Sequence, residues 1–197
     1  MKRSELSELH YITLIENVPS ILKLGLLSHH RAKAVDAVSV AMPEIQDIRA
    51  KKKVPGGRQL HDYTNLYLCA RNPMLYKRQA QHGELCVLKV STDVLDLPRV
   101  VIADGNAASD YTAFWPSPSG LERIDKELLF AEYWTDANQI VEWDKKRVKC
   151  AEVLVPDCVP PGYIQGCYVS CDEAERKLRA LGCSLAVWID PHLFFRS

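Results

Sequence analysis

Short apolar runs alternate with capped polar–apolar segments along the chain, and together they predict a mixture of strands and helices. Strand-like runs occur at residues 9–15, 65–70, 84–90, 99–104, 146–156 and 184–189. Helical segments occur at residues 17–25, 42–53, 71–83 and 171–181. Two of these helices have an asparagine to cap the start, a proline in the first turn and a glycine at the end: Asn17, Pro19 and Gly25, and Asn72, Pro73 and Gly83.

One acidic residue interrupts the predicted strand at 146–156, whose sequence is KRVKCAEVLVP. Alternation places Glu152 on the same face as three apolar residues, Val148, Cys150 and Leu154. A carboxylate on an apolar face is costly unless it is paired or opens into a cleft. Glu152 is therefore either a structural ion-pair partner of a nearby Lys or Arg, or a catalytic carboxylate on a rigid element beside a pocket.

Residues 104–144 form a long segment that leads directly into this strand and carries three of the four tryptophans. The segment is too long for a plain connection and too aromatic for a disordered linker. Long loops in compact domains usually bind a ligand or cover a site, so a binding function is predicted here.

Composition indicates an ordinary globular chain of 197 residues, 47% hydrophobic and 25% charged, which favours one domain over two. No apolar stretch approaches the ~20 residues of a membrane span, and no signal peptide is expected. Seven cysteines without a CxxC pair, and no zinc-like grouping, favour reduced thiols, a cytoplasmic location and no metal site. The chain also lacks GxGxxG and GxxxxGK[ST] loops, which argues against a Rossmann or P-loop enzyme.

The net charge is zero, but basic residues gather at 49–53 and 145–149. A neutral total argues against tight non-specific binding to nucleic acid, yet it leaves room for a basic groove on one face. The alternative to a nucleic-acid contact, for each cluster, is a solvated helix face or loop.

Three segments carry a family resemblance: HYITLIENVPSIL near the start, HDYTNLYLCARNPMLY in the middle and CAEVLVPDCVPPGYI late in the chain. In this order they resemble the DarT family, DNA ADP-ribosyltransferase toxins of bacterial toxin–antitoxin pairs. The resemblance covers nearly the whole chain. It implies one mixed α/β (α+β) domain over residues 1–197, with a split β-sheet around an NAD cleft and residues 104–144 as the substrate-recognition region.

The same resemblance implies roles for individual residues. Glu152 matches the catalytic glutamate, and Arg49 is the best match to the catalytic arginine within 49–53. His10, Thr13 and Asn17 match NAD-binding positions of the family, although the sequence departs from its pattern around Tyr11. Tyr67 is either a stacking partner for nicotinamide or a core tyrosine. The alternative role for His10 is structural, as is common for a lone histidine on a strand.

The resemblance further implies that the acceptor is a base in single-stranded DNA, most simply thymine, and that a macrodomain antitoxin is the partner. We expect DNA phosphates to meet four basic residues: Lys145, Lys146, Arg147 and Lys149. Aromatic residues of the long segment can stack unpaired bases or fill the core of a loop: Tyr111, Phe114, Trp115, Tyr133 and Trp134.

Three rival functions share some of these features. One is an ADP-ribosyltransferase of the same fold that acts on another base, on RNA or on protein, or an NAD hydrolase. The second is a non-catalytic nucleic-acid binding module that uses only the basic and aromatic residues. The third is a two-carboxylate hydrolase in which Glu152 works with Glu132 or Asp157.

Overall fold

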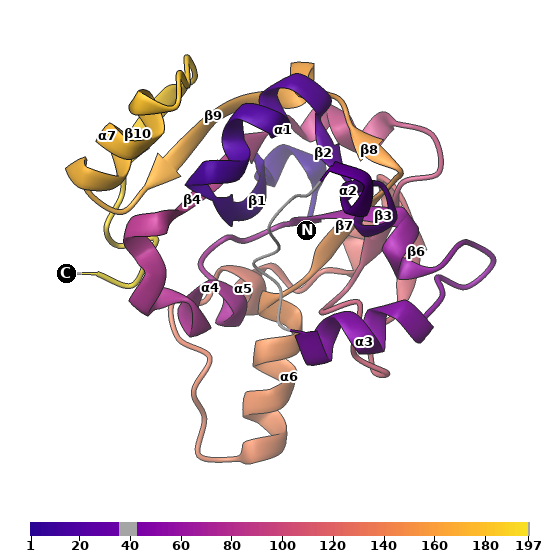
Figure 1. Cartoon of the computed structure of the whole chain (residues 1–197). Coiled ribbons are helices and arrows are strands. Elements are labelled where there is room, and N and C mark those ends of the chain that lie inside the picture. Colours follow the sequence, from indigo (N-terminus) through magenta and orange to yellow (C-terminus); the bar gives the residue numbers. More distant parts are fainter. Residues whose placement is uncertain (36–42, 197) are drawn as a thin grey trace.

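An eight-stranded sheet runs through the computed structural model, which describes residues 1–35 and 43–196 (Figure 1). The strand order is β10-β9-β4-β1-β3-β7-β5-β6, and every neighbouring pair is antiparallel except β9 and β10. The strands are β1 Leu9–Leu14, β3 Tyr63–Tyr67, β4 Leu85–Val90, β5 Val101–Ala103, β6 Phe114–Pro116, β7 Glu152–Pro156, β9 Ile164–Val169 and β10 Ala186–Ile189. A separate two-stranded sheet pairs β2 (Leu26–Leu27) with β8 (Cys158–Val159).

The sheet is split between its two central strands. β1 pairs with β4 through six registered residues and β3 pairs with β7 through five, but β1 and β3 share the single pair His10 and Tyr67. Beyond that pair, β1 and β3 share no registered residues, so the two strands diverge. The mixed fold with a split sheet is therefore confirmed.

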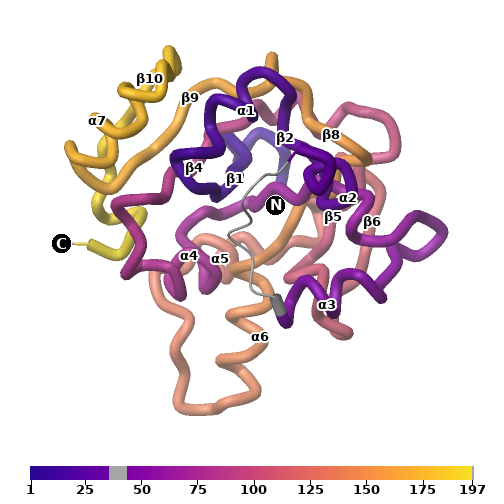
Figure 2. Tube along the Cα trace, in the orientation of Figure 1, coloured from indigo at the N-terminus to yellow at the C-terminus, as the bar shows by residue number. Residues whose placement is uncertain are grey.

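Helices surround the sheet and fill both of its faces. The α-helices are α1 Val18–Leu24, α2 His29–Ala32, α3 Pro43–Lys51, α4 Pro73–Lys77, α5 Lys126–Phe130, α6 Gln139–Lys149 and α7 Asp172–Ala180. Short 3-10 helices occupy Arg3–Glu5, Ile15–Asn17, Lys33–Val35, Leu60–Asp62, Gln79–Glu84, Thr92–Asp96, Ser119–Arg123 and Pro161–Tyr163. Figures 1 and 2 show α6 and the segment between α5 and α6 extending away from the sheet.

The main core lies on one face of the sheet, where α1 and α7 contribute Val18, Ile21, Ala174 and Leu178 to strand residues such as Leu66 and Val153. Leu66 is fully buried, and its replacement by alanine is expected to cost about 2–5 kcal/mol. A smaller cluster on the other face joins Ile12 and Leu75 to Phe194 near the C-terminus. Both faces of the sheet thus carry a packed apolar cluster, and the C-terminal segment contributes to the smaller one.

The two predicted helix caps fare differently. Asn72 accepts hydrogen bonds from the backbone N–H groups of Met74 and Leu75, at 3.0 and 3.1 Å, as a capping side chain should. Asn17 occupies the N-cap position of α1, but its Nδ2 donates to Thr13 Oγ1 at 3.2 Å instead. Gly25 ends α1 with φ +87°, and a Cβ there would lie 2.4 Å from the carbonyl oxygen of Val159. That position requires glycine.

The prediction of one strand over residues 146–156 is wrong in its first half. Residues 146–149 end α6, and β7 begins only at Glu152. Asn138 caps α6 through the N–H groups of Ile140 and Val141, and the basic residues favour the negative end of the helix dipole. Val148 consequently does not share a strand face with Glu152.

Other expectations also change in extent. The predicted helix at 71–83 ends at Lys77 and continues as a 3-10 helix over Gln79–Glu84, so Gly83 does not terminate α4. Residues 104–144 contain β6, α5 and the start of α6 and are not all loop.

β9 was not predicted, because Gln165 and Gly166 interrupt its apolar pattern. The Trp188 ring and the backbone of Ala186 pack closely on Gly166, because a Cβ there would lie 2.4 Å from the ring and 2.9 Å from the Ala186 oxygen. Met42, in the predicted second helix, lies outside the described residues.

Candidate active site

Glu152 is buried in the middle of the sheet and paired with an arginine from a helix. It is the first residue of β7, registered with Tyr67 of β3 on one side and Ala103 of β5 on the other. Arg49 of α3 donates through Nη1 to both carboxylate oxygens, at 3.2 and 3.1 Å. The Glu152 side chain is 1% exposed and that of Arg49 is 7% exposed.

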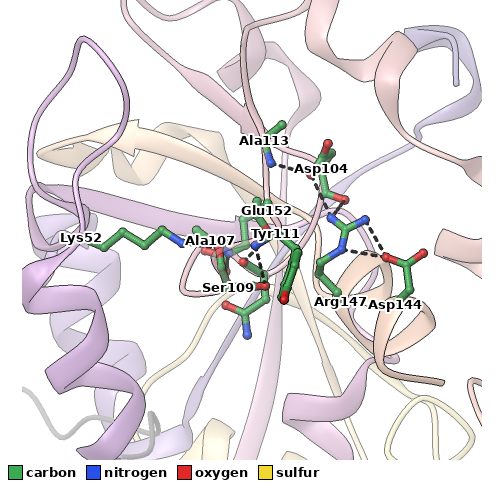
Figure 3. Close-up of polar contacts among 11 residues, drawn as sticks. Lys52, Asp104, Ala107, Ser109, Tyr111, Ala113, Asp144, Arg147 and Glu152 are labelled. Carbon is green, nitrogen blue, oxygen red and sulfur yellow. Dashed lines mark hydrogen bonds and ion pairs between the residues drawn. The ribbon is translucent and has the colours of Figure 1, made fainter. Parts of the chain in front are cut away.

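A second donor completes the surroundings of this carboxylate. The backbone N–H of Ala107, in the loop after β5, donates to Glu152 Oε1 at 3.1 Å (Figure 3). Burying a charge is costly unless a partner and hydrogen bonds replace the lost water, and Arg49 and Ala107 together do so. The pairing is also a strong constraint on position, because a strand, a helix and a loop meet at one carboxylate.

Glu152 and Arg49 line a cavity of about 290 Å³ that lies where β1 and β3 diverge. Thr13, Asn17 and Tyr67 line the same cavity, so the structure brings five of the predicted residues together. The Asn17–Thr13 hydrogen bond ties the end of β1 to the start of α1 along this wall. Glu152 is thus both an ion-pair partner and a cavity residue, and the two interpretations of its sequence position do not exclude each other.

Tyr67 is buried beside the carboxylate and lines the cavity with part of its side chain. Burial, followed by the negative charge of Glu152, raises the pKa of Tyr67 well above its usual value. The hydroxyl therefore stays protonated at neutral pH and remains a hydrogen-bond donor.

His10 does not line the cavity. Its Nε2 lies 3.0 Å from Glu8 Oε1, and Glu8 also accepts from Tyr168 at 2.9 Å and pairs with Lys89 at 2.9 Å. Burial favours a raised pKa for Glu8, but its hydrogen bonds, led by that of His10, outweigh burial and hold the pKa at about 2. The geometry places His10 in a polar network on the sheet, and its contact with NAD stays a prediction.

Two histidines that the sequence did not single out line the cavity near Arg49. His29 follows β2, His61 lies in the 3-10 helix before β3, and their ring centroids are 4.0 Å apart. Burial, together with the charges of His29, His30 and Arg49, lowers the pKa of His61 to about 4. His61 is therefore neutral at physiological pH. It stands in the HDYTNLY motif, which was the available signal for it.

The four predicted DNA-contacting residues have different environments. Lys149 is 1% exposed and donates to the backbone oxygen of Ala131 at 2.7 Å, so its side chain cannot reach a phosphate and that expectation is wrong. Lys145 pairs with Asp136 at 2.8 Å, and Lys146 pairs with Glu142 one turn earlier on α6. The guanidinium of Arg147 points back toward the loop after β5 (Figure 3).

The described residues contain no group of three or more His, Cys, Asp or Glu side chains arranged to hold a metal ion. Among the same residues, no helix is long and apolar enough to cross a membrane.

The split sheet and the buried Arg–Glu pair in its cleft are features of an ADP-ribosyltransferase. The family model described as "ssDNA thymidine ADP-ribosyltransferase, DarT" matches residues 10–195, and the chain belongs to this family.

Known relatives agree with this assignment. A DNA ADP-ribosyl transferase–DNA ADP-ribosyl glycohydrolase fusion protein of Thermosipho africanus is 35% identical over an alignment of 197 positions, which covers 95% of this chain and 49% of the relative. The chain thus spans about half the length of that fusion protein. The structure of Thermus sp. 2.9 DarT in complex with ADP-ribosylated ssDNA matches with 27% identity and a TM-score of 0.80, covering 98% of this chain and 99% of the other. The same Thermus protein in complex with carba-NAD+ matches with 25% identity and a TM-score of 0.78, covering 96% and 98%.

Proposed function

We propose that this chain transfers ADP-ribose from NAD to a thymine base in single-stranded DNA. The observation that carries the proposal is the Arg49–Glu152 pair at the cavity where the sheet splits. Membership of the DarT family and likeness to a Thermus DarT with modified ssDNA and with carba-NAD+ support the same substrates. NAD is consumed in this reaction as a co-substrate.

The first chemical step breaks the bond between the nicotinamide nitrogen and ribose C1′. Both electrons of that bond go to nicotinamide, which leaves as a neutral molecule, while C1′ gains oxocarbenium character. A carboxylate that accepts a hydrogen bond from the ribose 2′-OH stabilises this positive charge, as in glycoside hydrolysis. We assign that role to Glu152, because β7 fixes its backbone and two donors fix its oxygens.

The second step joins thymine to the ribose. In DNA, thymine N1 already carries the deoxyribose, so N3 is the ring nitrogen available for attack on C1′. The new bond forms from N3 as its proton leaves, and the products are N3-linked ADP-ribose, nicotinamide and one proton. We assign removal of this proton to the Arg49–Glu152 pair, which lies at the same end of the cavity.

The acceptor must be unpaired for this chemistry. In a duplex the N3 proton is held by adenine within the stack, and extrusion of the base costs a few kcal/mol. Two of the predicted aromatic residues have the exposure that base stacking needs, since Tyr111 is 89% exposed and Tyr133 is 70% exposed. Trp134 is 9% exposed, and the guanidinium of Arg123 lies over the Trp115 ring. We therefore assign neither tryptophan to base stacking.

We propose that residues 104–144 recognise the DNA and that two partly exposed lysines of α6, Lys145 and Lys146, meet its phosphates. They remain partly accessible despite their acidic partners, at 27% and 40% of the side chain. We also propose one domain over residues 1–197.

The test uses labelled NAD with equal amounts of single-stranded oligonucleotides with and without thymine, the matching duplex, RNA and a protein extract. We expect label on the thymine-containing single strand only. Label on RNA or protein, or equally on the thymine-free strand, would support a rival transferase. Wild-type protein that gives no label on any acceptor but releases nicotinamide would support an NAD hydrolase.

A macrodomain partner and a toxic role form part of the same proposal. The Thermosipho relative joins a transferase to a DNA ADP-ribosyl glycohydrolase in one chain, which supports pairing with an enzyme that removes the modification. Because DNA and NAD meet in the cytoplasm of a bacterium, we propose that location. Expression of this chain in a bacterial host should arrest growth, and co-expression of a macrodomain glycohydrolase should restore it.

A further inference from the structure

We infer that Arg147 is a positioning residue for Glu152: it fixes the loop whose Ala107 N–H holds the catalytic carboxylate. This inference rests on the proposed function of Glu152 and gives Arg147 a role different from DNA binding. The loop comprises residues 104–113, which connect β5 to β6. Arg147 lies on α6, close to the start of β7, and Figure 3 shows it facing this loop.

Arg147 holds the loop through its side chain and its backbone. Its Nη1 donates to the Oδ1 of Asp104 at 3.0 Å and to the backbone oxygen of the same residue at 3.3 Å. Its backbone oxygen accepts from the N–H of Asn106 at 3.0 Å. Its Nε donates to Asp144 at 2.9 Å, which fixes the guanidinium plane from the helix side.

The loop passes this restraint on to Ala107. Asp104 Oδ1 also accepts from the N–H of Ala113 at 3.0 Å, which closes the base of the loop, and Thr112 Oγ1 donates to the oxygen of Asn106 at 2.7 Å. Ala107 is fully buried between these bonds, and its N–H reaches Glu152 Oε1. Release of Asp104 would therefore free Ala107, whose backbone N–H orients the carboxylate.

A second cation holds the loop from the opposite side. Lys52, which follows α3, donates to the backbone oxygen of Ser109 and lies 3.4 Å from Asp110. Arg49 and Lys52 come from one segment, while Arg147 and Glu152 come from another. The loop is thus tied to both of the segments that supply the catalytic pair, and its position is coupled to theirs.

Gly105 adds steric evidence for this close fit. A Cβ on Gly105 would lie 2.7 Å from Arg147 Cγ and 2.6 Å from its Nη1. The backbone of the loop thus packs directly on the arginine side chain. A phosphate ligand would need the guanidinium to turn outward, but its side chain is 19% exposed and two acids already satisfy it.

The experiment compares Arg147→Gln, Asp104→Asn and Gly105→Ala with wild type in three assays. The first assay gives kcat and KM for NAD in DNA modification. The second gives the Kd for single-stranded DNA, with each substitution combined with Glu152→Gln so that no transfer occurs. The third follows hydrogen exchange of the loop amides. Arg3→Gln and Asp96→Asn are the matched controls, because Arg3 and Asp96 form a doubly bonded Arg–Asp pair at 2.7 Å elsewhere on the surface.

We expect all three loop variants to lower kcat by ~10- to 100-fold, as small misplacements of catalytic groups do, with KM for NAD within about threefold of wild type. Loop amides, Ala107 above all, should exchange faster in each. Asp104→Asn is decisive, because removal of an acid cannot weaken an electrostatic contact with DNA. Arg147→Lys should restore kcat only in part, since an ammonium cannot bridge Asp104 and Asp144 as a planar guanidinium does.

The inference is overturned if Arg147→Gln weakens ssDNA binding while Asp104→Asn and Gly105→Ala leave kcat at the wild-type value, or if loop exchange is unchanged in Arg147→Gln. Failure of the proposed function would look different: wild-type protein would then label no thymine-containing strand. The exchange measurement would still report whether Arg147 holds the loop, because it requires no turnover.

Discussion

Tyr67 is the registered partner of both His10 in β1 and Glu152 in β7. One tyrosine therefore marks the place where the two halves of the sheet are still joined and the place where the carboxylate stands. Both Tyr67 and Glu152 line the cavity, so the carboxylate proposed as catalytic is held where the sheet is still joined. Rigid support of this kind is what a group acting only in the transition state requires.

Replacement of Glu152 by glutamine should abolish transfer while the protein still folds and binds NAD. Glutamine keeps the volume and can still accept from Ala107, but it lacks the charge that stabilises the oxocarbenium ion. We expect kcat to fall by at least ~10³-fold, with an NAD-induced rise in melting temperature close to that of wild type. Glu152→Ala is the poorer test, because it leaves the Arg49 guanidinium buried without its partner, which costs about 3–5 kcal/mol. A Gln variant with a tenth of wild-type activity would assign Glu152 a structural role.

Arg49→Lys should lower kcat by tenfold or more even though it keeps the charge. Arg49 donates through one nitrogen, Nη1, to both oxygens of a buried carboxylate, and lysine would replace its delocalised guanidinium by a more strongly hydrated ammonium, which is costlier to bury. Arg58→Lys is the matched control, since Arg58 contacts both oxygens of Asp157 at 2.9 Å near the surface. Equal losses in the two variants would show that the effect is not specific to the cavity.

Glu8→Gln should remove an acid-sensitive part of the stability. The folded pKa of Glu8 is about 2 against an ordinary value of 4.5. Its ionisation therefore stabilises the folded state above pH 4.5, and this contribution is lost as the pH falls from 4.5 toward 2. We expect Glu8→Gln to reduce the free energy of unfolding by about 1–3 kcal/mol at pH 7 and by much less at pH 2.5. Urea denaturation at both pH values measures this, with the exposed Glu16→Gln as control, and a loss of the same size at both values would contradict it.

His61→Gln should make stability less sensitive to mild acid. Because the pKa of His61 is lowered to about 4 from 6.5, the unfolded chain binds a proton more readily between those values. The wild-type protein therefore loses stability through this residue as the pH falls from 6.5 to 4. The variant should lose about 1–3 kcal/mol less over that interval in chemical denaturation. Identical slopes for variant and wild type would show that His61 does not titrate as its surroundings indicate.

Tyr111→Ala should weaken binding of single-stranded DNA without changing NAD affinity. The ring is 89% exposed on the loop beside Glu152, and a stacked base contributes roughly 1–3 kcal/mol. Tyr111→Phe keeps the ring and should bind DNA like wild type. Fluorescence anisotropy with a short thymine-containing oligonucleotide separates the two, and equal Kd values for Ala and Phe would exclude stacking at this position.

Sequence patterns predicted those elements that depend on neighbouring residues. The family resemblance supplied the pair Arg49 and Glu152. The Asn72 cap, for example, depends on two neighbouring N–H groups. The α6 helix was missed because a short apolar run after basic residues suits a helix end as well as a strand. The pairing of Arg147 with Asp104 joins residues far apart in the chain, and the environment of His10 is set by β4 and β9. Neither is visible in a pattern of neighbouring residues.

The loop at 104–113 contacts Glu152 through Ala107 yet lies outside the strands that hold this residue. Asp104, Gly105 and Asn106 contact Arg147, Ala107 contacts Glu152, and the carbonyl of Ser109 accepts from Lys52. Ala107, Ala108 and Thr112 are buried, whereas Asp110 and Tyr111 at the tip are exposed. Only the tip can therefore be exchanged between related proteins without disturbing the contacts that hold Glu152. Under the proposed function, the tip can change to suit another acceptor while the surroundings of the carboxylate stay the same.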